Sequence, residues 1–153
     1  MKRKLIILIL ISIPIIFFDQ LLKYIVNERI PIYRNIPVIR HFFNIVHVNN
    51  RGVAFGLLNN YSNILIIAFT SLVILLLIYG LFRIKIVSGL FSVSMSLVIS
   101  GAFSNLVNRI FSGYVVDFLD FHIKGYHWPS FNLADSSVVI GTILIFISII
   151  KYI

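Results

Sequence analysis

Most of the carboxylates in this chain lie in one short stretch. Of five acidic residues, Asp117, Asp120 and Asp135 fall within GYVVDFLDFHIKGYHWPSFNLADSS, residues 113–137. Two aspartates brought close together cannot both ionise cheaply, so one keeps a proton while the other acts as a base on a water molecule. The protonated partner can polarise a scissile carbonyl group. These residue types predict peptide hydrolysis by two carboxylates without a cofactor, and spacing alone leaves open whether Asp117 or Asp120 pairs with Asp135.

Two further sets of polar residues interrupt apolar runs. Asp19 and Lys23 are four residues apart, so on a helix they share one face and can pair. Gly101, Asn105 and Arg109 follow one another at intervals of four and form one helical stripe. Ionisable residues near a membrane are costly and indicate function. The simpler alternatives are a structural ion pair for Asp19 with Lys23 and a lipid-headgroup anchor for Arg109.

The acidic stretch also has a purely structural interpretation. Asp135 follows Asn132 by three residues, so it fits the first turn of a helix whose N-cap is Asn132. Asp117 and Asp120 would then be solvated loop acids. The histidines have no H-E-x-x-H or other metal-binding spacing, so we expect interfacial or solvated roles for them and predict no metal site. They are His41, His47, His122 and His127.

The elements that must position these residues cross a membrane. The 153-residue chain is 59% hydrophobic and 12% charged, whereas soluble domains carry about a quarter charged residues. Apolar runs at about 5–26, 63–82, 86–110 and 132–150 each approach the ~20 residues that a transmembrane helix needs. The first run follows MKRK as a signal peptide would, but it is too long and lacks a cleavage site. We predict one all-α membrane domain, 1–153, with four transmembrane helices and a small outer β-sheet.

Charge gives the expected orientation. Four spans place both termini on one side, and the positive-inside rule makes the side with dense basic residues cytoplasmic. Those residues are Lys2, Arg3, Lys4, Arg83, Lys85 and Lys151. The net charge of +8 is then expected to meet anionic lipid rather than nucleic acid. In this orientation the polar groups collect near the outer interface, whereas a transporter or channel subunit, the main alternative, would distribute them through the membrane depth. A non-catalytic scaffold is the second alternative.

Two local patterns describe how the spans and the outer segment pack. Serines recur every four residues from Ser88 to Ser104, which favours a close-packing face over a hydroxyl-lined path. In the outer segment, 27–62, HFFNIVHVNNRGVAFGLL predicts a strand, a turn at residues 50–52 and a second strand. Small residues at Gly52, Ala54 and Gly56 would let this sheet act as a lid over a substrate.

Five motifs in order resemble one family. They are DQLLK, NRGVAFG, GAFSNLVNR, GYVVDFLDF and FNLADS. Together they are similar to the lipoprotein signal peptidases, or signal peptidase II, of bacterial inner membranes. The resemblance implies an aspartic endopeptidase that removes the signal peptide of a prolipoprotein just before its diacylglyceryl-modified cysteine, at the outer membrane face. It also implies inhibition by a cyclic peptide such as globomycin. A monomer is the simplest expectation.

The resemblance assigns roles to individual positions. It makes Asp117 and Asp135 the catalytic pair, 18 residues apart in sequence, and excludes Asp120 from it. The supporting or substrate-contacting positions would be Asp19, Lys23, Asn50, Gly101, Asn105, Arg109, Asn132 and Ala134. One position departs from the family, because Asn108 stands where an acid usually precedes the arginine. Asparagine accepts a hydrogen bond but cannot form an ion pair, so the network around Arg109 is expected to be altered while activity survives.

Overall fold

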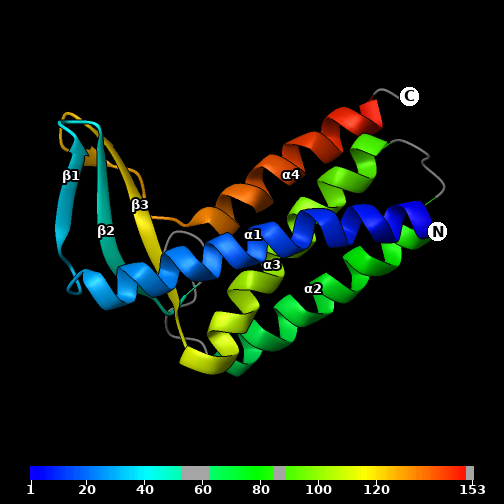
Figure 1. Ribbon diagram of the computed structural model, residues 1–153, viewed down its shortest axis with the longest axis horizontal. Helices are drawn as coiled ribbons and strands as arrows, with labels where there is room; N and C mark the ends of the chain where they lie inside the picture. The colour runs from blue at the N-terminus through cyan, green and yellow to red at the C-terminus, as the bar shows by residue number, and fades with distance from the viewer. Residues whose placement is uncertain (53–62, 85–88, 151–153) are drawn as a thin grey trace.

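A bundle of long helices carries a small sheet at one end. The computed structural model describes residues 1–52, 63–84 and 89–150. Within them the helices are α1 (Lys2–Arg29), α2 (Asn63–Arg83), α3 (Gly89–Ser112) and α4 (Leu133–Ile150). All four are long and apolar enough to cross a membrane. The four predicted spans are confirmed, and α1 extends three residues beyond each predicted end. Both termini lie at the end of the bundle opposite the sheet (Figure 1).

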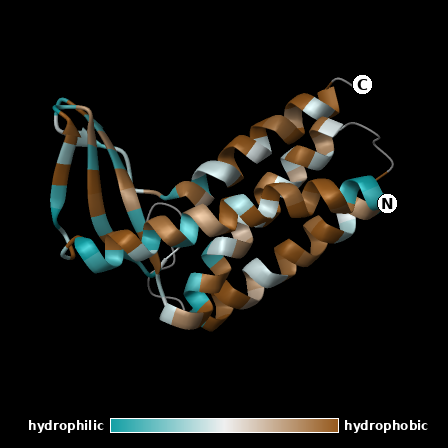
Figure 2. Ribbon diagram, in the orientation of Figure 1, coloured by the Kyte–Doolittle hydropathy of each residue, from teal (hydrophilic) through white to brown (hydrophobic). Residues whose placement is uncertain are grey.

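The outer surface of the helix bundle is apolar. Apolar residues cover the helices along most of their length (Figure 2). Large hydrophobic side chains such as Leu10, Ile64 and Phe146 are about two-thirds exposed. Such continuous exposed apolar surface is unusual for a soluble protein and fits contact with acyl chains. The chain is therefore a multi-pass membrane protein.

Helix α3 is the centre of the bundle, and small residues let its neighbours approach. Buried hydroxyls of Ser96 and Ser100 donate to backbone carbonyls one turn earlier in α3, each at 2.7 Å. The serine period thus produces a close-packing face, as predicted, and Ser88 lies outside the described residues. A Cβ at Gly101 would overlap α4 at the carbonyl oxygen of Ala134. A Cβ at Gly141 would lie 2.8 Å from the Ser94 carbonyl oxygen, so α3 and α4 are in backbone contact at two levels.

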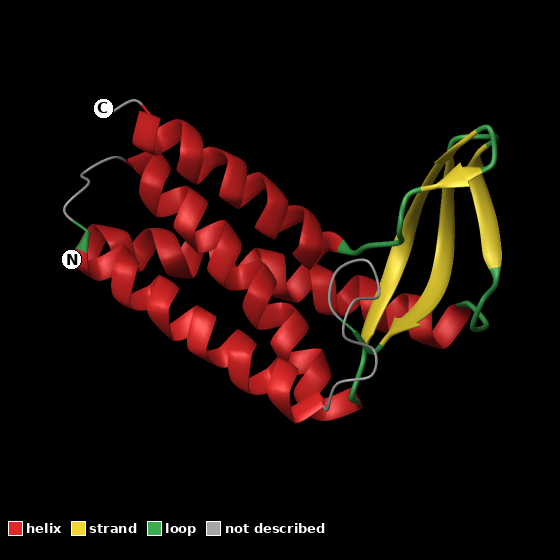
Figure 3. Cartoon of the chain, turned by 180° about the vertical axis from the view of Figure 1, so that it is seen from behind, coloured by secondary structure: helices red, strands yellow, loops and turns green. Residues whose placement is uncertain are grey.

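The predicted small sheet is present, and it includes strands that the sequence did not indicate. Its strands are β1 (Asn35–Ile39), β2 (Phe43–Asn50), β3 (Val115–Ile123) and β4 (Tyr126–His127), antiparallel in the order β1-β2-β3-β4. The predicted turn after Asn50 is present, but the second strand predicted after it lies outside the described residues, as do Ala54 and Gly56. Among the described residues, the pairing partners of β2 are β1 and β3 (Figure 3). The stretch VVDFLDFHI, for which no strand was predicted, is a central strand.

Candidate active site

The two aspartates singled out by the sequence line one pocket. Asp117 lies in β3 and Asp135 lies in the first turn of α4. Both face a pocket of about 540 Å³ whose other walls include Trp128, Pro129 and Val139. The pocket lies where β3, the segment before α4 and the start of α4 meet. Two carboxylates in a largely apolar cavity are the arrangement that aspartate-dyad chemistry requires.

Asn132 connects the two carboxylates. Its Oδ1 accepts the Asp135 backbone N–H at 2.9 Å, and Asp135 Oδ2 accepts the Asn132 backbone N–H at 3.2 Å. This reciprocal pair is a capping box, and it confirms Asn132 as the N-cap. The remaining donor of Asn132, Nδ2, reaches Asp117 Oδ1 at 2.7 Å. The structural interpretation of Asp135 and the catalytic one are thus compatible, because the cap positions the carboxylate.

Asp117 is buried and held from its second oxygen as well. Asn50 Nδ2 donates to Asp117 Oδ2 at 2.9 Å, while Asn50 Oδ1 accepts the Gly52 backbone N–H at 2.9 Å. Asn50 therefore uses its turn geometry to present a donor to β3. Burial, with a smaller contribution from the charge of Asp135, raises the pKa of Asp117 to about 6 against the opposing hydrogen bonds. The Asp117 carboxyl therefore binds a proton at mildly acidic pH.

Behind Asp135 runs a continuous chain of charge-assisted hydrogen bonds. Asn105 Nδ2 donates to Asp135 Oδ1 at 2.8 Å, and Asn105 Oδ1 accepts from Lys23 Nζ at 2.7 Å. Lys23 pairs with Asp19 at 2.7 Å, which confirms the ion pair predicted from their spacing. Asp19 Oδ1 accepts the backbone N–H of Ala134, in the first turn of α4, at 2.9 Å. The chain begins and ends on the element that carries Asp135.

Comparison with known proteins agrees with this geometry. The sequence matches the family model for Signal peptidase (SPase) II over residues 11–151. A lipoprotein signal peptidase of Halothermothrix orenii is 42% identical over 136 residues, which cover 89% of this chain and 90% of the relative. A Staphylococcus aureus lipoprotein signal peptidase is 39% identical over 143 residues, or 94% of this chain and 87% of the relative. The chain belongs to the signal peptidase II family.

Solved structures carry the same fold. One, described as a bacterial membrane enzyme determined by the in meso method at 2.3 Å resolution, has a TM-score of 0.87 at 38% identity and covers 94% of this chain and 87% of its own. A second, at 1.9 Å resolution, has a TM-score of 0.82 at 36% identity, with coverage of 94% and 92%. Membership of a peptidase family leaves the transporter or channel alternative unsupported.

In this signal peptidase II family member the side chain of Asn108 bonds to two residues of α1. Its side chain exchanges two hydrogen bonds with Gln20, at 3.1 and 2.9 Å, and accepts a third from Lys23 Nζ at 2.9 Å. Lys23 thereby has a partner for each of its three N–H donors. Gln20 also donates to Ser104. Sequence reasoning missed Gln20, although its position next to Asp19 in an apolar run was a usable signal.

Arg109 has a structural partner rather than a lipid one. Its side chain is 7% exposed, which excludes the headgroup-anchor alternative. Nη2 donates to the backbone carbonyl of Gly52, and the Arg109 backbone carbonyl accepts from Asn63 Nδ2 at 3.0 Å. Arg109 therefore fastens the turn that presents Asn50 to Asp117. Asn108 takes no part in this contact, because its side chain bonds to Gln20 and Lys23 of α1.

Asp120 stands apart from the pocket. It is separated by three residues from Asp117, so in a regular strand its side chain points to the opposite face of β3. Asn44 Nδ2 donates to its Oδ2 at 2.7 Å, and His127 Nδ1 lies 2.8 Å from its Oδ1. With both acids at most 3% exposed, the solvated-loop alternative is wrong for Asp117 and Asp120 alike.

The solvated or interfacial role expected for His47 is also wrong, because that ring is buried and bonds to the Ile30 carbonyl at 2.6 Å.

Proposed function

We propose that this chain is an aspartic endopeptidase that removes the signal peptide from diacylglyceryl-modified prolipoproteins, cutting just before the lipidated cysteine. Family membership supports a peptidase, and the names of the relatives support a lipoprotein precursor as substrate. The observation that carries the aspartic mechanism is the shared pocket of Asp117 and Asp135, bridged by Asn132. No cofactor takes part in this mechanism.

The two carboxylates take different roles because their surroundings differ. Asp135 lies at the N-terminus of α4 and accepts from Asn105 and from a backbone N–H. These donors favour its carboxylate against the cost of burial, and we assign it the role of the base. Asp117, with its pKa raised to about 6, holds the proton. Substrate that displaces water from the pocket strengthens this preference.

The reaction follows from these roles. Asp135 removes a proton from a water molecule held between the carboxylates, and the resulting hydroxide attacks the scissile carbonyl carbon. Asp117 donates its proton to the carbonyl oxygen, which gives a neutral tetrahedral diol. When the C–N bond breaks, a proton passes from Asp135 to the leaving amine, and Asp117 recovers a proton from the diol hydroxyl. Both carboxyls return to their starting states.

The pocket and the charge distribution fit a membrane-held substrate. Apolar residues of the first turns of α4, Val138, Val139 and Ile140, form one wall, next to lipid-exposed surface. A signal helix and an acyl chain are both apolar and reach the site laterally without crossing water. We infer an inner-membrane location with both termini in the cytoplasm and the pocket at the outer face, since the termini lie at the end opposite the sheet and carry the dense basic residues (Figure 1).

Cleavage of a diacylated prolipoprotein by the purified protein in detergent tests the proposal. Asp117→Asn and Asp135→Asn should each lower turnover by about 10²–10⁴-fold, the usual value of a general acid or base. Glu28→Gln is the matched control, because it makes the same carboxylate-to-amide change at an exposed position of α1. Asp120→Asn, which changes the acid outside the pocket, should cleave well above both dyad variants.

Three results would contradict the proposal. Retained cleavage in either dyad variant would mean that the base or acid is another group. Equal loss in Asp120→Asn and Asp117→Asn would remove the distinction between the two strand acids. Absence of cleavage by the folded wild-type protein would favour the alternative that the chain is a non-catalytic membrane scaffold. A monomeric enzyme and inhibition by globomycin stay predictions for the same preparation.

A further inference from the structure

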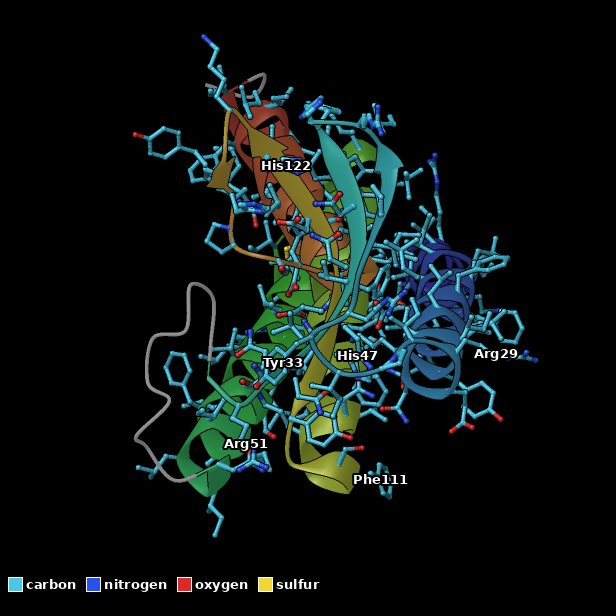
Figure 4. All side chains as sticks on the ribbon, turned by 90° about the vertical axis from the view of Figure 1, so that its left-hand side faces the viewer. Arg29, Tyr33, His47, Arg51, Phe111 and His122 are labelled. Carbon is cyan, nitrogen blue, oxygen red and sulfur yellow. The ribbon has the colours of Figure 1, made fainter. Side chains whose placement is uncertain are left out.

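A second cluster of ligand-type side chains lies on the sheet, away from the dyad. His122 lies at the opposite end of the sheet from Arg51 and from Phe111 at the C-terminal end of α3 (Figure 4). Asp120, His122 and His127 each offer one ligand atom there, and these atoms all lie within 4.8 Å of one another. The spacing D-x-H-x₄-H matches none of the motifs considered for the sequence. Strand pairing, rather than helical spacing, brings the three residues together.

The backbone fixes this cluster without help from an ion. Asp120 and His122 are two residues apart in β3 and so share a face. His127 is the cross-strand partner of His122 in the β3–β4 pair. The connecting turn is two residues long, and both of them, Lys124 and Gly125, have positive φ, of 51° and 84°. Such turns match the twist of the strands, so the two histidines are held opposite each other.

The ligand-type atoms of the three side chains lie close to one another. His127 Nδ1 lies 2.8 and 3.0 Å from the two carboxylate oxygens of Asp120, and His122 Nδ1 lies 3.9 Å from Asp120 Oδ2. The two imidazole rings are nearly parallel, with centroids 4.7 Å apart. Asn44 Nδ2 approaches His122 Nδ1 at 3.1 Å, and since an amide nitrogen only donates, this Nδ1 carries a lone pair. His122 is therefore in the neutral form, in which an imidazole nitrogen can bind a metal ion.

We propose that Asp120, His122 and His127 bind one Zn²⁺ ion, with the fourth position open. Two imidazoles and a carboxylate are a common zinc donor set, and bonds of about 2.0–2.1 Å in a tetrahedron separate ligand atoms by about 3.3 Å. The longest present separation of 4.8 Å closes by about 1.5 Å, which rotation of the His127 side chain, 49% exposed, permits. Asn44, buried and bonded to Asp120, is the outer partner that orients the carboxylate.

The ion would link His127 of β4 to Asp120 and His122 of β3. Asp117 lies in the same strand, three positions before Asp120. His122 and His127 also line a second pocket, of about 400 Å³, whose other walls include the aromatic side chains of Phe42, Tyr126 and Trp128. The site is separate from the dyad, because Asp120 points to the other face of β3. Zinc binding therefore does not depend on the proposed hydrolysis, and either can fail alone.

The test is zinc binding by the full-length protein in detergent, purified with a tag that lacks histidine and stripped with a chelator. Equilibrium dialysis against buffered free Zn²⁺, with metal counted by mass spectrometry, should give one zinc per chain. His122→Gln and His127→Gln should each bind at least about tenfold more weakly. His41→Asn is the matched control: it removes an exposed histidine of the same sheet, and asparagine tolerates the positive φ of 62° there. It should bind as wild type does.

Asp117→Asn separates the two proposals, because it should abolish cleavage and keep full zinc binding. Stripped protein reloaded with Co²⁺ provides a second readout that needs no variant, since four-coordinate Co²⁺ with nitrogen ligands absorbs strongly in the visible range. Less than one zinc per chain at saturation, affinity unchanged in both glutamine variants, or only the weak spectrum of six-coordinate Co²⁺ would each overturn the zinc site and leave a hydrogen-bonded cluster.

Discussion

Replacing Asp117 by asparagine should stabilise the protein relative to wild type as the pH rises from 4 to 7, while it lowers turnover by about 10²–10⁴-fold. The pKa of Asp117 is raised from 3.8 to about 6, mainly by burial. In the folded protein, ionising the buried carboxyl costs free energy of unfolding. Because the folded pKa exceeds the unfolded one, this cost is absent below pH 3.8, grows as the pH rises and is complete above about 6. The difference of about two pH units corresponds to about 3 kcal/mol, at 1.36 kcal/mol for each unit. Asparagine does not ionise and never incurs this cost.

Asp117→Asn also loses a hydrogen bond, and a comparison of stability at two pH values separates this loss from the cost of ionisation. Asp117 accepts one hydrogen bond at each oxygen, from Asn132 and Asn50. An asparagine has one acceptor oxygen, so one donor loses its partner, at about 1–3 kcal/mol. Asparagine does not ionise, so position 117 contributes a pH dependence only in the wild type. The quantity to compare is therefore the change in the stability difference between variant and wild type across this pH range.

Thermal unfolding in detergent, followed by the fluorescence of the single tryptophan, Trp128, measures this quantity. For a chain of this size 1 kcal/mol corresponds to about 2–4 °C, so Asp117→Asn should gain about 6–12 °C on wild type between pH 4 and pH 7. Glu28→Gln should run parallel to wild type. A difference that stays constant across the pH range would refute the claim that Asp117 is a penalised, desolvated carboxyl, and with it the assignment of Asp117 as the proton holder.

Three further variants test the support of the site. Gly101→Ala should lower stability by about 1–3 kcal/mol in thermal unfolding, because its Cβ would overlap α4, whereas Gly80→Ala, which meets only side-chain atoms at 3.8 Å, should not. Lys23→Met should cost about 3–5 kcal/mol by leaving Asp19 without its cation, and a double variant with Asp19→Asn should recover much of the loss. Asn108→Asp should change kcat/KM by no more than about fivefold, since a charged hydrogen bond exceeds a neutral one by about 1 kcal/mol. A rise above tenfold would indicate that the native network is compromised.

Local patterns carried most of what the sequence could predict. The Asp19–Lys23 pair and the Asn132 cap each depend on residues three or four apart, and helix geometry alone brings such residues together. The spans followed from apolar run length in the same way. Gly101 was identified by its position in a stripe, but its backbone contact with α4 depends on residues more than thirty positions away.

Long-range pairing accounts for what was missed. No strand was predicted at β3, because its two aspartates hide the apolar pattern of a strand. Both carboxylates are satisfied by side-chain amides, Asn50 and Asn132 for Asp117 and Asn44 for Asp120, and this satisfaction makes their burial affordable. The partners lie 15 to 76 residues away in sequence, so no local sequence pattern predicts these hydrogen bonds.

The position of Asp135 follows from the problem of beginning a helix near a membrane. The first N–H groups of α4 have no partner within the helix, and little water is available to satisfy them. Asn132 Oδ1 accepts the N–H of Asp135, and Asp19 of α1 accepts the N–H of Ala134. A buried carboxylate at Asp19 needs a cation, which Lys23 provides, and Lys23 then orients Asn105 toward Asp135. The groups that complete the helix end are thus the groups that aim the proposed base, so a mutation in α1 should alter both folding and the geometry of the dyad.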